Sequence, residues 1–211
     1  MRVLDLPQGS EAWLAARAGK VTASRINDVL SRSRDRKNEG STRRNYKAQI
    51  IAERLSGRPQ ENGFQSKAME NGLELEPLAR SAYEVAKGVL VDLVGFVLHP
   101  SIERSGASPD ALVGTDGVLE IKAPFPATHI GYLLAGEVPT EYENQILWQL
   151  ACTERAWVDF VSYCPAFPPH LQLFIARFNR DDARILEITA EVNVFLREVD
   201  EIIERLNRKA A

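Results

Sequence analysis

The feature that most constrains the fold is a pair of short apolar runs separated by Thr115, Asp116 and Gly117. The runs cover residues 107–113 and 118–123 and are rich in small and β-branched residues. An Asp-Gly pair between two such runs is a strong signal for a β-hairpin. This part of the chain is therefore predicted to form two antiparallel strands, and the core must accommodate a sheet.

Helical and strand patterns alternate around this hairpin. Before it, helices are predicted at residues 11–19, 22–30, 42–57 and 66–87, and a strand at residues 89–98. After it, the spacing predicts helices at residues 126–134, 140–152 and 192–206, and strands at residues 156–163 and 171–178. Residues 31–40 lack apolar periodicity and are predicted to be a mobile loop.

Local signals place several helix boundaries. Ser10 is predicted to cap the first helix, and Thr22 or Ser24 the second. Thr140 and Glu143 have the spacing of a capping box. Pro77 is expected to kink or restart the fourth helix, because proline cannot donate the helical hydrogen bond. Together the elements predict one α/β domain over residues 1–211, with a central mixed β-sheet flanked by helices.

The composition is that of an ordinary globular protein. The 211 residues are 45% hydrophobic and 26% charged, so disorder is not indicated. Cys152 and Cys164 are too few for a disulfide framework. The first residues lack the apolar run of a signal peptide, and no stretch is apolar enough to span a membrane. A cytoplasmic protein without a membrane partner is therefore expected.

The charge is unevenly distributed, although the net charge is only -3. Residues 31–47 contain seven cationic side chains, Arg32, Arg34, Arg36, Lys37, Arg43, Arg44 and Lys47, against Asp35 and Glu39. Residues 181–206 are acidic, with Asp181, Asp182, Glu187, Glu191, Glu198, Asp200, Glu201 and Glu204. These runs are either solvated helix faces or, for the basic one, an entrance for a polyanion.

The chemically informative residues lie on the predicted hairpin. Asp110 is predicted on its first strand, whereas Glu120 and Lys122 are two residues apart on the second and share a face. Ile121 then points into the core. Two adjacent carboxylates repel each other, and a hard divalent cation such as Mg²⁺ or Mn²⁺ relieves that repulsion. The alternative is that these are charges on the exposed face of an edge hairpin, since such a spacing also arises by chance.

Several further motifs extend this pattern in a fixed order. They are Gln8-Gly-Ser-Glu-Ala-Trp13, Arg17-Ala-Gly-Lys-Val-Thr-Ala-Ser24, Glu74-Leu-Glu-Pro-Leu-Ala-Arg80 with Tyr83, Gly106-Ala-Ser-Pro-Asp-Ala-Leu-Val113, Leu119-Glu-Ile-Lys-Ala-Pro124, Tyr142-x-x-Gln145 and Trp157-Val-Asp-Phe-Val-Ser-Tyr163. With these motifs the chain resembles the phage lambda exonuclease and its YqaJ-like viral recombinase relatives, within the PD-(D/E)XK nucleases. The resemblance implies a restriction-endonuclease-like core.

The resemblance implies a metal site at the matching positions. Asp110 and Glu120 would be the metal carboxylates, and the carbonyl of Ile121 a further ligand. Glu76 matches a helix carboxylate that completes the site, through metal-bound water. The alternative for Glu76 is an exposed glutamate on the surface of a helix, beside Pro77.

The resemblance also implies roles for residues that are not ligands. Lys122 would orient or deprotonate the nucleophilic water, and Gln145 matches an active-site glutamine on the following helix. The alternative for Gln145 is a solvated or capping amide. Arg17, Ser24 and Ser108 match a pocket for a 5′-terminal phosphate, for which a guanidinium and hydroxyls are suitable donors. Ser24 is otherwise a helix cap.

Two positions depart from the family pattern. Ala111 follows Asp110 where the family usually has glycine, which matters if that position requires a positive φ. Ala123 follows Lys122 where cysteine is common. Five aromatic or imidazole side chains are expected to be structural, namely Trp13, Tyr142, His99, His129 and His170.

The implied function is a Mg²⁺-dependent 5′-to-3′ exonuclease acting on double-stranded DNA ends. It would leave 3′ single-stranded tails for phage-type recombination, with two Mg²⁺ ions, for which Mn²⁺ can substitute. The resemblance further implies a bacterial or phage-encoded protein, a single-strand annealing protein as partner, and a homotrimeric ring. In that ring we expect residues 32–47 to line the DNA entrance and the acidic C-terminal helix to form the outer wall. Alternatives are a PD-(D/E)XK endonuclease of restriction or junction-resolving type, and a catalytically inactive DNA-binding module.

Overall fold

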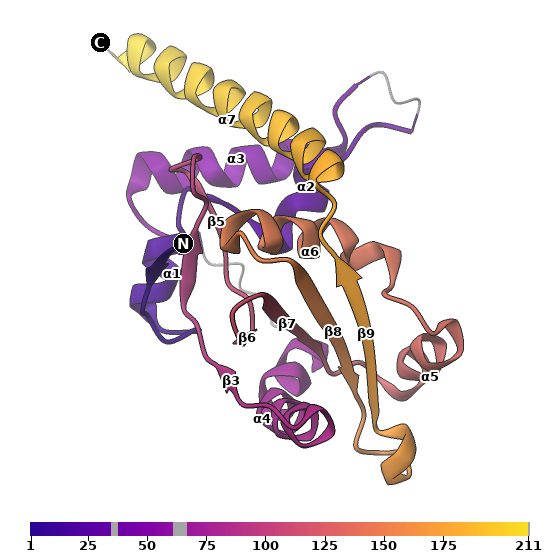
Figure 1. The fold of residues 1–211 in the computed structure, drawn as a ribbon. Helices are drawn as coiled ribbons and strands as arrows, with labels where there is room; N and C mark the ends of the chain where they lie inside the picture. The colour runs from indigo at the N-terminus through magenta and orange to yellow at the C-terminus, as the bar shows by residue number, and fades with distance from the viewer. Residues whose placement is uncertain (35–37, 61–66, 211) are drawn as a thin grey trace.

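The computed structural model describes residues 1–34, 38–60 and 67–210, which form two mixed β-sheets surrounded by helices (Figure 1). The smaller sheet has the order β1 (Arg2–Leu4), β4 (Phe96–Leu98), β5 (Ser105–Ala107) and β2 (Val21–Thr22). The larger sheet has the order β3 (Val91–Asp92), β6 (Ala111–Val113), β7 (Gly117–Lys122), β8 (Trp157–Tyr163) and β9 (Leu173–Asn179). The predicted fold class is confirmed, with the strands divided between two sheets.

The helices cover both faces of the larger sheet. They are α1 (Glu11–Arg17), η1 (Ala23–Arg25), α2 (Ile26–Leu30), α3 (Ser41–Ser56), α4 (Lys67–Lys87), α5 (Pro126–Ala135), α6 (Thr140–Thr153), η2 (Pro169–Leu171) and α7 (Asp182–Ala210). In Figure 1, α4 lies on one side of β7 and β8, and α6 lies on the other side beneath α2, α3 and α7. Within the described residues, no helix is both long enough and apolar enough to cross a bilayer.

The predicted hairpin is confirmed. β6 and β7 pair antiparallel, with Ala111 opposite Leu119 and Val113 opposite Gly117. Gly117 is required here, because a Cβ atom would come within 2.1 Å of the Trp157 ring. β7 also pairs in parallel with β8, and α5 and α6 form the crossover connection that parallel strands need.

Two predicted strands each divide between the sheets. Residues 89–98 form β3 in the larger sheet and β4 in the smaller one, and residues 107–113 divide into the end of β5 and β6. Asp110 therefore precedes β6 and does not lie on a strand, which corrects the prediction. Pro109 beside it cannot donate a ladder hydrogen bond. A continuous apolar run does not reveal such a change of sheet, because the residues on both sides of the division are mainly apolar.

The boundaries of the helices confirm one predicted cap and correct two others. The Ser10 hydroxyl accepts a hydrogen bond from the Trp13 amide, as predicted. Thr22 makes no such bond at the start of η1, and α2 begins without a side-chain cap. The capping box at Thr140 is also wrong, because Pro139 is the N-cap and Glu143 instead forms an ion pair with Arg184 at 2.7 Å.

The remaining local predictions concern Pro77 and the basic loop. The helix α4 continues through Pro77, so it does not restart there. Its predicted first residue, Ser66, lies outside the described residues. Residues 31–34 and 38–40 form a loop with an isolated bridge between Arg32 and Glu39, and residues 35–37 lie outside the described part. The predicted loop is confirmed for the residues described.

The core is organised around α6. Its residues 146–153 are all buried, and they pack between the larger sheet and the layer of α2, α3 and α7. A second, smaller cluster lies on the other face of the sheet, where Tyr83 of α4 is buried and donates a 2.8 Å hydrogen bond to the buried Asp159. The larger sheet is therefore packed on both faces. The helix α6 is held between this sheet and the layer of α2, α3 and α7, which positions the side chains at its N-terminal end.

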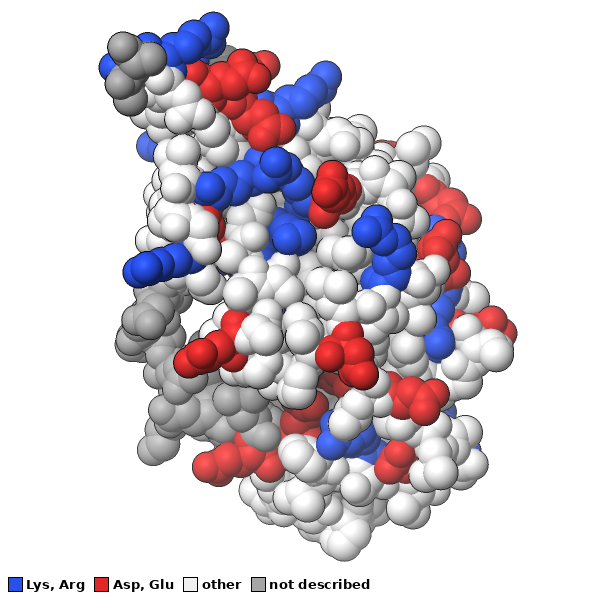
Figure 2. Space-filling view, turned by 90° about the vertical axis from the view of Figure 1, so that its left-hand side faces the viewer, with Lys and Arg blue, Asp and Glu red and all other residues white. Residues whose placement is uncertain are grey.

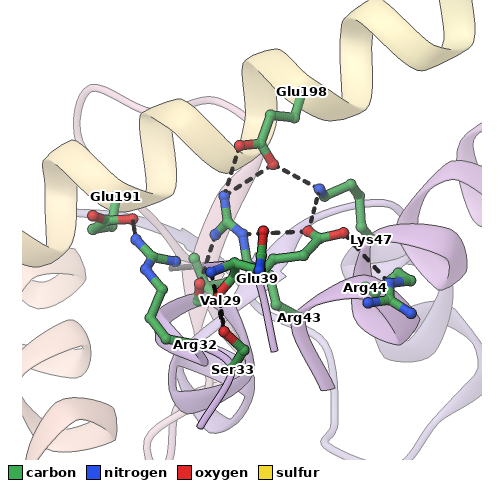
Figure 3. A network of polar contacts seen from close by, with 10 residues as sticks. Val29, Arg32, Ser33, Glu39, Arg43, Arg44, Lys47, Glu191 and Glu198 are labelled. Atoms are coloured by element: carbon green, nitrogen blue, oxygen red, sulfur yellow. Dashed lines mark hydrogen bonds and ion pairs between the residues drawn. The ribbon is translucent and has the colours of Figure 1, made fainter. Parts of the chain in front are cut away.

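An ion-pair network fastens α7 to α3 and to the loop before it (Figure 3). Arg43 is 2% exposed, donates two hydrogen bonds to Glu198 at 2.9 and 3.0 Å, and donates another to the Val29 carbonyl at 2.6 Å. Lys47 lies 2.7 Å from Glu198, and Arg32 lies 2.6 Å from Glu191. Acidic residues of α7 therefore neutralise part of the basic stretch within one chain. The expectation that the acidic helix forms the outer wall of a ring stays a prediction, because contacts within one chain do not test it.

Replacing Glu198 by alanine should destabilise the fold, because it removes the carboxylate that accepts two hydrogen bonds from the buried Arg43 guanidinium and leaves the more distant Glu39, at 3.8 Å. We expect the free energy of unfolding to fall by about 1 to 2 kcal/mol, since Glu198 itself is partly exposed. Urea denaturation measures this change. Glu201→Ala, which removes an exposed carboxylate from the same helix, is the control and should change stability by less than about 0.5 kcal/mol. Equal losses in both variants would contradict the role of the network.

Candidate active site

A cavity of about 170 Å³ lies where the hairpin, α1, η1 and α6 meet. The described residues that line it are Gln8, Trp13, Arg17, Ala23, Ser24, Ser108, Asp110, Glu120, Lys122, Gln145 and Gln149. The structure therefore brings seven of the nine predicted site residues to one place, from segments far apart in the sequence. Glu76 and Ile121 are not part of this lining.

Asp110 is held at the start of the hairpin by its own backbone and by β7. Its amide donates to the Leu119 carbonyl at 3.2 Å, and its carboxylate accepts from the Ile121 amide at 2.5 Å. Burial raises the pKa of Asp110 well above its ordinary value, and the neighbouring Glu120 carboxylate raises it further. The two acidic groups are therefore close enough for the charge of Glu120 to oppose the ionisation of Asp110.

Glu120 is almost fully buried, at 2% exposed, and its carboxylate accepts hydrogen bonds from three side chains. Gln145 donates to one carboxylate oxygen at 2.6 Å, and Lys122 forms an ion pair with that same oxygen. Gln149 donates to the other oxygen at 2.5 Å. A carboxylate can remain buried when its oxygens accept hydrogen bonds of this kind.

Lys122 is held as a cation. Burial alone would lower its pKa, but the carboxylates of Glu120 and Asp110 outweigh burial and raise it. The ammonium also lies 5.2 Å from the centre of the Tyr142 ring. Tyr142 packs against Phe160 of the core, so its predicted structural role is consistent with its contacts.

Glu76 approaches the site from α4, on the other side of the hairpin. It forms an ion pair with Arg80 at 3.4 Å, one helical turn away. Burial raises its pKa, while Arg80 lowers it and Glu120 contributes a further rise. Its charge therefore acts on the Asp110–Glu120 pair, although Glu76 does not line the cavity.

The donor set fits a hard divalent cation. The described residues that line the cavity include two carboxylates and no imidazole or thiol, which favours Mg²⁺ or Mn²⁺ over zinc. Among the described residues, no three acidic, histidine or cysteine side chains gather at metal-ligand spacing. A two-carboxylate site suits Mg²⁺, which keeps several water ligands and uses few protein side chains.

A second group of donors, from α1, η1 and the segment before β6, forms another wall of the cavity. Arg17 donates to the Ser108 hydroxyl oxygen at 2.9 Å, and the Trp13 indole donates to the same oxygen at 3.0 Å. The Arg17 guanidinium stacks 3.9 Å above the Trp13 ring, and burial lowers its pKa to about 10. Ser24 lines the same cavity, with its hydroxyl 3.5 Å from that of Thr22. This wall can bind an anion.

Four cavity residues were not predicted as site residues, and three of them, all except Ala23, donate side-chain hydrogen bonds. Gln149 follows Gln145 by one helical turn, so the i, i+4 spacing was the signal that both amides face Glu120. Gln8 donates to the carbonyls of Val94 and Pro109 at 2.9 and 2.8 Å and so fixes the chain just before Asp110. Trp13, expected only to pack, orients both Arg17 and Ser108. For Gln8 and Trp13, no local pattern distinguishes these roles from those of an ordinary surface amide or a packed indole.

Ala111, which replaces the usual glycine of the family, and the histidines His99 and His129 are ordinary structural residues. Ala111 is fully buried and does not have a positive φ, so the absence of glycine there causes no strain. His99 stacks on Trp148 with ring centres 4.9 Å apart, and His129 contacts Ser162 at 2.7 Å. Both are buried away from the cavity.

Comparison with known protein families matches residues 12–156 to the YqaJ-like viral recombinase domain. The chain belongs to this family. The matched region begins before Arg17 and ends after α6, so it contains the cavity residues from Trp13 to Gln149. A search among curated proteins gives no match.

The chain is similar to two solved proteins over nearly all of its length. An alkaline exonuclease from Laribacter hongkongensis, LHK-Exo, is 46% identical, with a TM-score of 0.87, and the match covers 95% of this chain and 98% of that one. The same enzyme in complex with dAMP matches with a TM-score of 0.88. A phage-related exonuclease from Haemophilus somnus 129PT shares the fold alone, at 15% identity and a TM-score of 0.70, over 89% of this chain and 96% of that one.

Proposed function

We propose that the protein is a Mg²⁺-dependent 5′-to-3′ exonuclease that degrades one strand of double-stranded DNA from its ends and leaves 3′ single-stranded tails. The observation that carries the proposal is the single cavity that joins the Asp110, Glu120 and Lys122 cluster to the Arg17 and Ser108 wall. The cavity therefore combines the groups for phosphodiester hydrolysis with a group of donors that can bind an anion.

The family and its relatives support a nuclease. LHK-Exo, at 46% identity, is an alkaline exonuclease, and it has been solved with dAMP. A nucleoside monophosphate is the product class expected when an exonuclease removes one nucleotide at a time. The membership in a viral recombinase family supports a role in phage-type recombination, in the cytoplasm of a bacterial host.

The metal would be held by the carboxylates of Asp110 and Glu120 and by the Ile121 carbonyl, with Glu76 acting through water. When bound, Mg²⁺ supplies Lewis-acid stabilisation of the negative charge that develops on the phosphate, and a second ion would assist the leaving oxygen. The raised pKa of Asp110 beside Glu120 reflects the repulsion that such a cation relieves. Mn²⁺ should substitute, since it accepts the same oxygen ligands.

The chain's own groups position the water and the scissile phosphate. The Lys122 ammonium can orient the attacking water, and Gln145 keeps Glu120 in place through its amide. The water oxygen bonds to phosphorus, the bond from phosphorus to the 3′ oxygen breaks, and that oxygen takes up a proton. The products are a 5′-mononucleotide and a strand that again carries a 5′-phosphate.

The Arg17 wall would set the polarity. A 5′-terminal phosphate bound by Arg17, Ser24 and Ser108 would place the next phosphodiester beside Asp110 and Glu120. The guanidinium is stacked on Trp13 and already directed at Ser108, so it is preorganised for a dianion. An endonuclease of restriction or junction-resolving type has no need of a terminal phosphate, and an inactive DNA-binding module has no need of the buried carboxylate pair.

Asp110→Ala should abolish cleavage, because it removes a metal carboxylate. Lys122→Ala should retain DNA binding and lower the cleavage rate by at least about 100-fold. The assay compares linear duplex with covalently closed circular DNA, in Mg²⁺ and in chelator. Asp116→Ala removes an exposed carboxylate from the turn of the same hairpin and serves as the control. Cleavage of closed circles would identify an endonuclease, and normal digestion by Asp110→Ala would defeat the site assignment.

Arg17→Ala should erase a preference for 5′-phosphorylated over 5′-hydroxyl ends, because the guanidinium is the charged donor of that wall. Initial rates on two otherwise identical duplexes measure the preference. Arg44→Ala, which removes an exposed cation from α3, is the control and should keep it. If the unmutated protein digested both ends equally, the terminal-phosphate pocket would be excluded.

The homotrimeric ring and the single-strand annealing partner remain proposals from the family resemblance. The α7 network weakens the charge argument for the ring, because three cations of the basic stretch are already paired within the chain. Light scattering at micromolar concentration should give a mass three times the 23.5 kDa of the chain. A monomer mass would exclude the ring and leave the exonuclease proposal standing.

A further inference from the structure

A second cationic cluster lies outside the active-site cavity, around the turn between α1 and β2. Lys20 is at the centre of this turn. On one side of it, the Arg54 side chain donates to the Gly19 carbonyl at 2.9 Å. On the other side, the Val21 amide donates to the Arg104 carbonyl at 2.9 Å. Three cations from α3, from this turn and from the loop before β5 are therefore brought together by specific contacts.

Arg54 is the buried member of this cluster. Its side chain is 6% exposed, and one terminal nitrogen forms an ion pair with Asp200 at 2.7 Å. The other terminal nitrogen, Nη2, is buried and has no hydrogen-bond partner in the described part of the chain. A buried donor on a charged group is costly when it is unsatisfied, so an acceptor is expected beside it.

The charges around Arg54 are not balanced as they are in the α7 network. Burial lowers the pKa of Lys20, and Arg104 and Arg54 lower it further, against an opposing effect of Glu103. The pKa of Arg54 is lowered by burial and then by Arg104. Asp200 and Glu103 are the carboxylates that act on this cluster, and Asp200 is 53% exposed.

The contrast with α7 shows why ordinary surface cations do not account for this cluster. Glu198 accepts from both Arg43 and Lys47 within 3.0 Å, so those cations have a full partner. In this second cluster the cations repel one another, and one donor is buried and unpartnered. Figure 2 shows Lys and Arg side chains gathered on this face of the molecule, below the C-terminal end of α7 and with an acidic side chain beside them.

We propose that Lys20, Arg54 and Arg104 form a binding site for a phosphate group, separate from the Arg17 wall. An oxyanion would offer several acceptors to these donors and would cancel their mutual repulsion. The exposed Arg104 and the half-buried Lys20 would contact it from the surface, above the buried Arg54 guanidinium. The phosphate is either part of a DNA backbone or a free phosphate compound.

The position of the turn near Arg17 favours a DNA backbone as the source of the phosphate group. This part of the inference rests on the proposed function. Lys20 follows Arg17 closely, and its amide donates to the Arg17 carbonyl at 3.1 Å. A duplex whose end is at Arg17 therefore has its neighbouring phosphates on the same part of the molecule. Each phosphate contact of this kind strengthens binding in a salt-dependent manner and does not depend on the DNA sequence.

The first experiment measures free phosphate, without DNA or metal. Inorganic phosphate and pyrophosphate are titrated against the unmutated protein, a Lys20→Gln/Arg104→Gln variant and a Lys87→Gln control, and the rise in melting temperature is recorded. Lys87 is an exposed cation at the end of α4. We expect the rise to be at least halved in the double variant and unchanged in the control. The Arg17 wall is intact in all three proteins, so its contribution cancels.

The second experiment measures DNA binding in chelator, where no strand is cut, so its result is independent of whether the protein is an exonuclease. Binding of a short 5′-phosphorylated duplex is followed by fluorescence anisotropy at several salt concentrations. If a DNA phosphate occupies the site, Arg104→Gln should lower the slope of log affinity against log salt by about 1 relative to Lys87→Gln. A smaller melting shift with an unchanged slope would support a free phosphate compound as the occupant. If the double variant matched the control in the first experiment and Arg104→Gln matched it in the second, the site would be excluded.

The substitutions themselves should be tolerated. Lys20 and Arg104 are not buried, and Arg54, which ties α3 to the Gly19 turn, is left in place. Melting temperatures without phosphate verify that the variants fold. If Lys20→Gln/Arg104→Gln is more stable than the unmutated protein in the absence of phosphate, this supports the repulsion on which the inference is based.

Discussion

The buried carboxylate of Glu120 is the constraint on which the rest of the site depends. A charge at 2% exposure is stable only if its oxygens are satisfied, and here Lys122, Gln145 and Gln149 satisfy them. These three donors come from β7 and α6, so the strand and the helix must keep a fixed relative position. The crossover from β7 through α5 and α6 to β8, and the burial of residues 146–153 of α6, provide that position.

Two clusters of cations on the same chain illustrate how charge can be used differently. Near α7, acidic residues of a long helix compensate the cations of α3, and the result is a fastened helix. Around Lys20, the cations have few carboxylates and retain a buried donor that has no partner among the described residues. The first arrangement serves stability, because its charges are matched inside the chain. The second is suited to an external anion for the opposite reason.

Much of the site could be predicted from the sequence, because its chemistry resides in short motifs. The Asp-Gly turn sets the hairpin, and the two-residue spacing sets Glu120 and Lys122 on one face, so their proximity follows from strand geometry. Asp110 was predicted beside Glu120 and is found there, although it precedes β6. The family resemblance indicated that Arg17, Ser24 and Ser108 belong together, and the structure places all three on one cavity.

What the sequence determined by itself is therefore local: the hairpin, the helix α1 with its Ser10 cap, and the spacing of the carboxylates and hydrogen-bond donors. Tertiary structure decided the division of two apolar runs between two sheets, the pairing of the basic stretch with α7, and the roles of Gln149 and Trp13. The physical reason is that hydrogen bonding, burial and ion pairing between distant segments depend on their final positions in space. A run of buried residues looks the same in one sheet or two, and a cation looks the same whether its partner is water, a carboxylate or a phosphate.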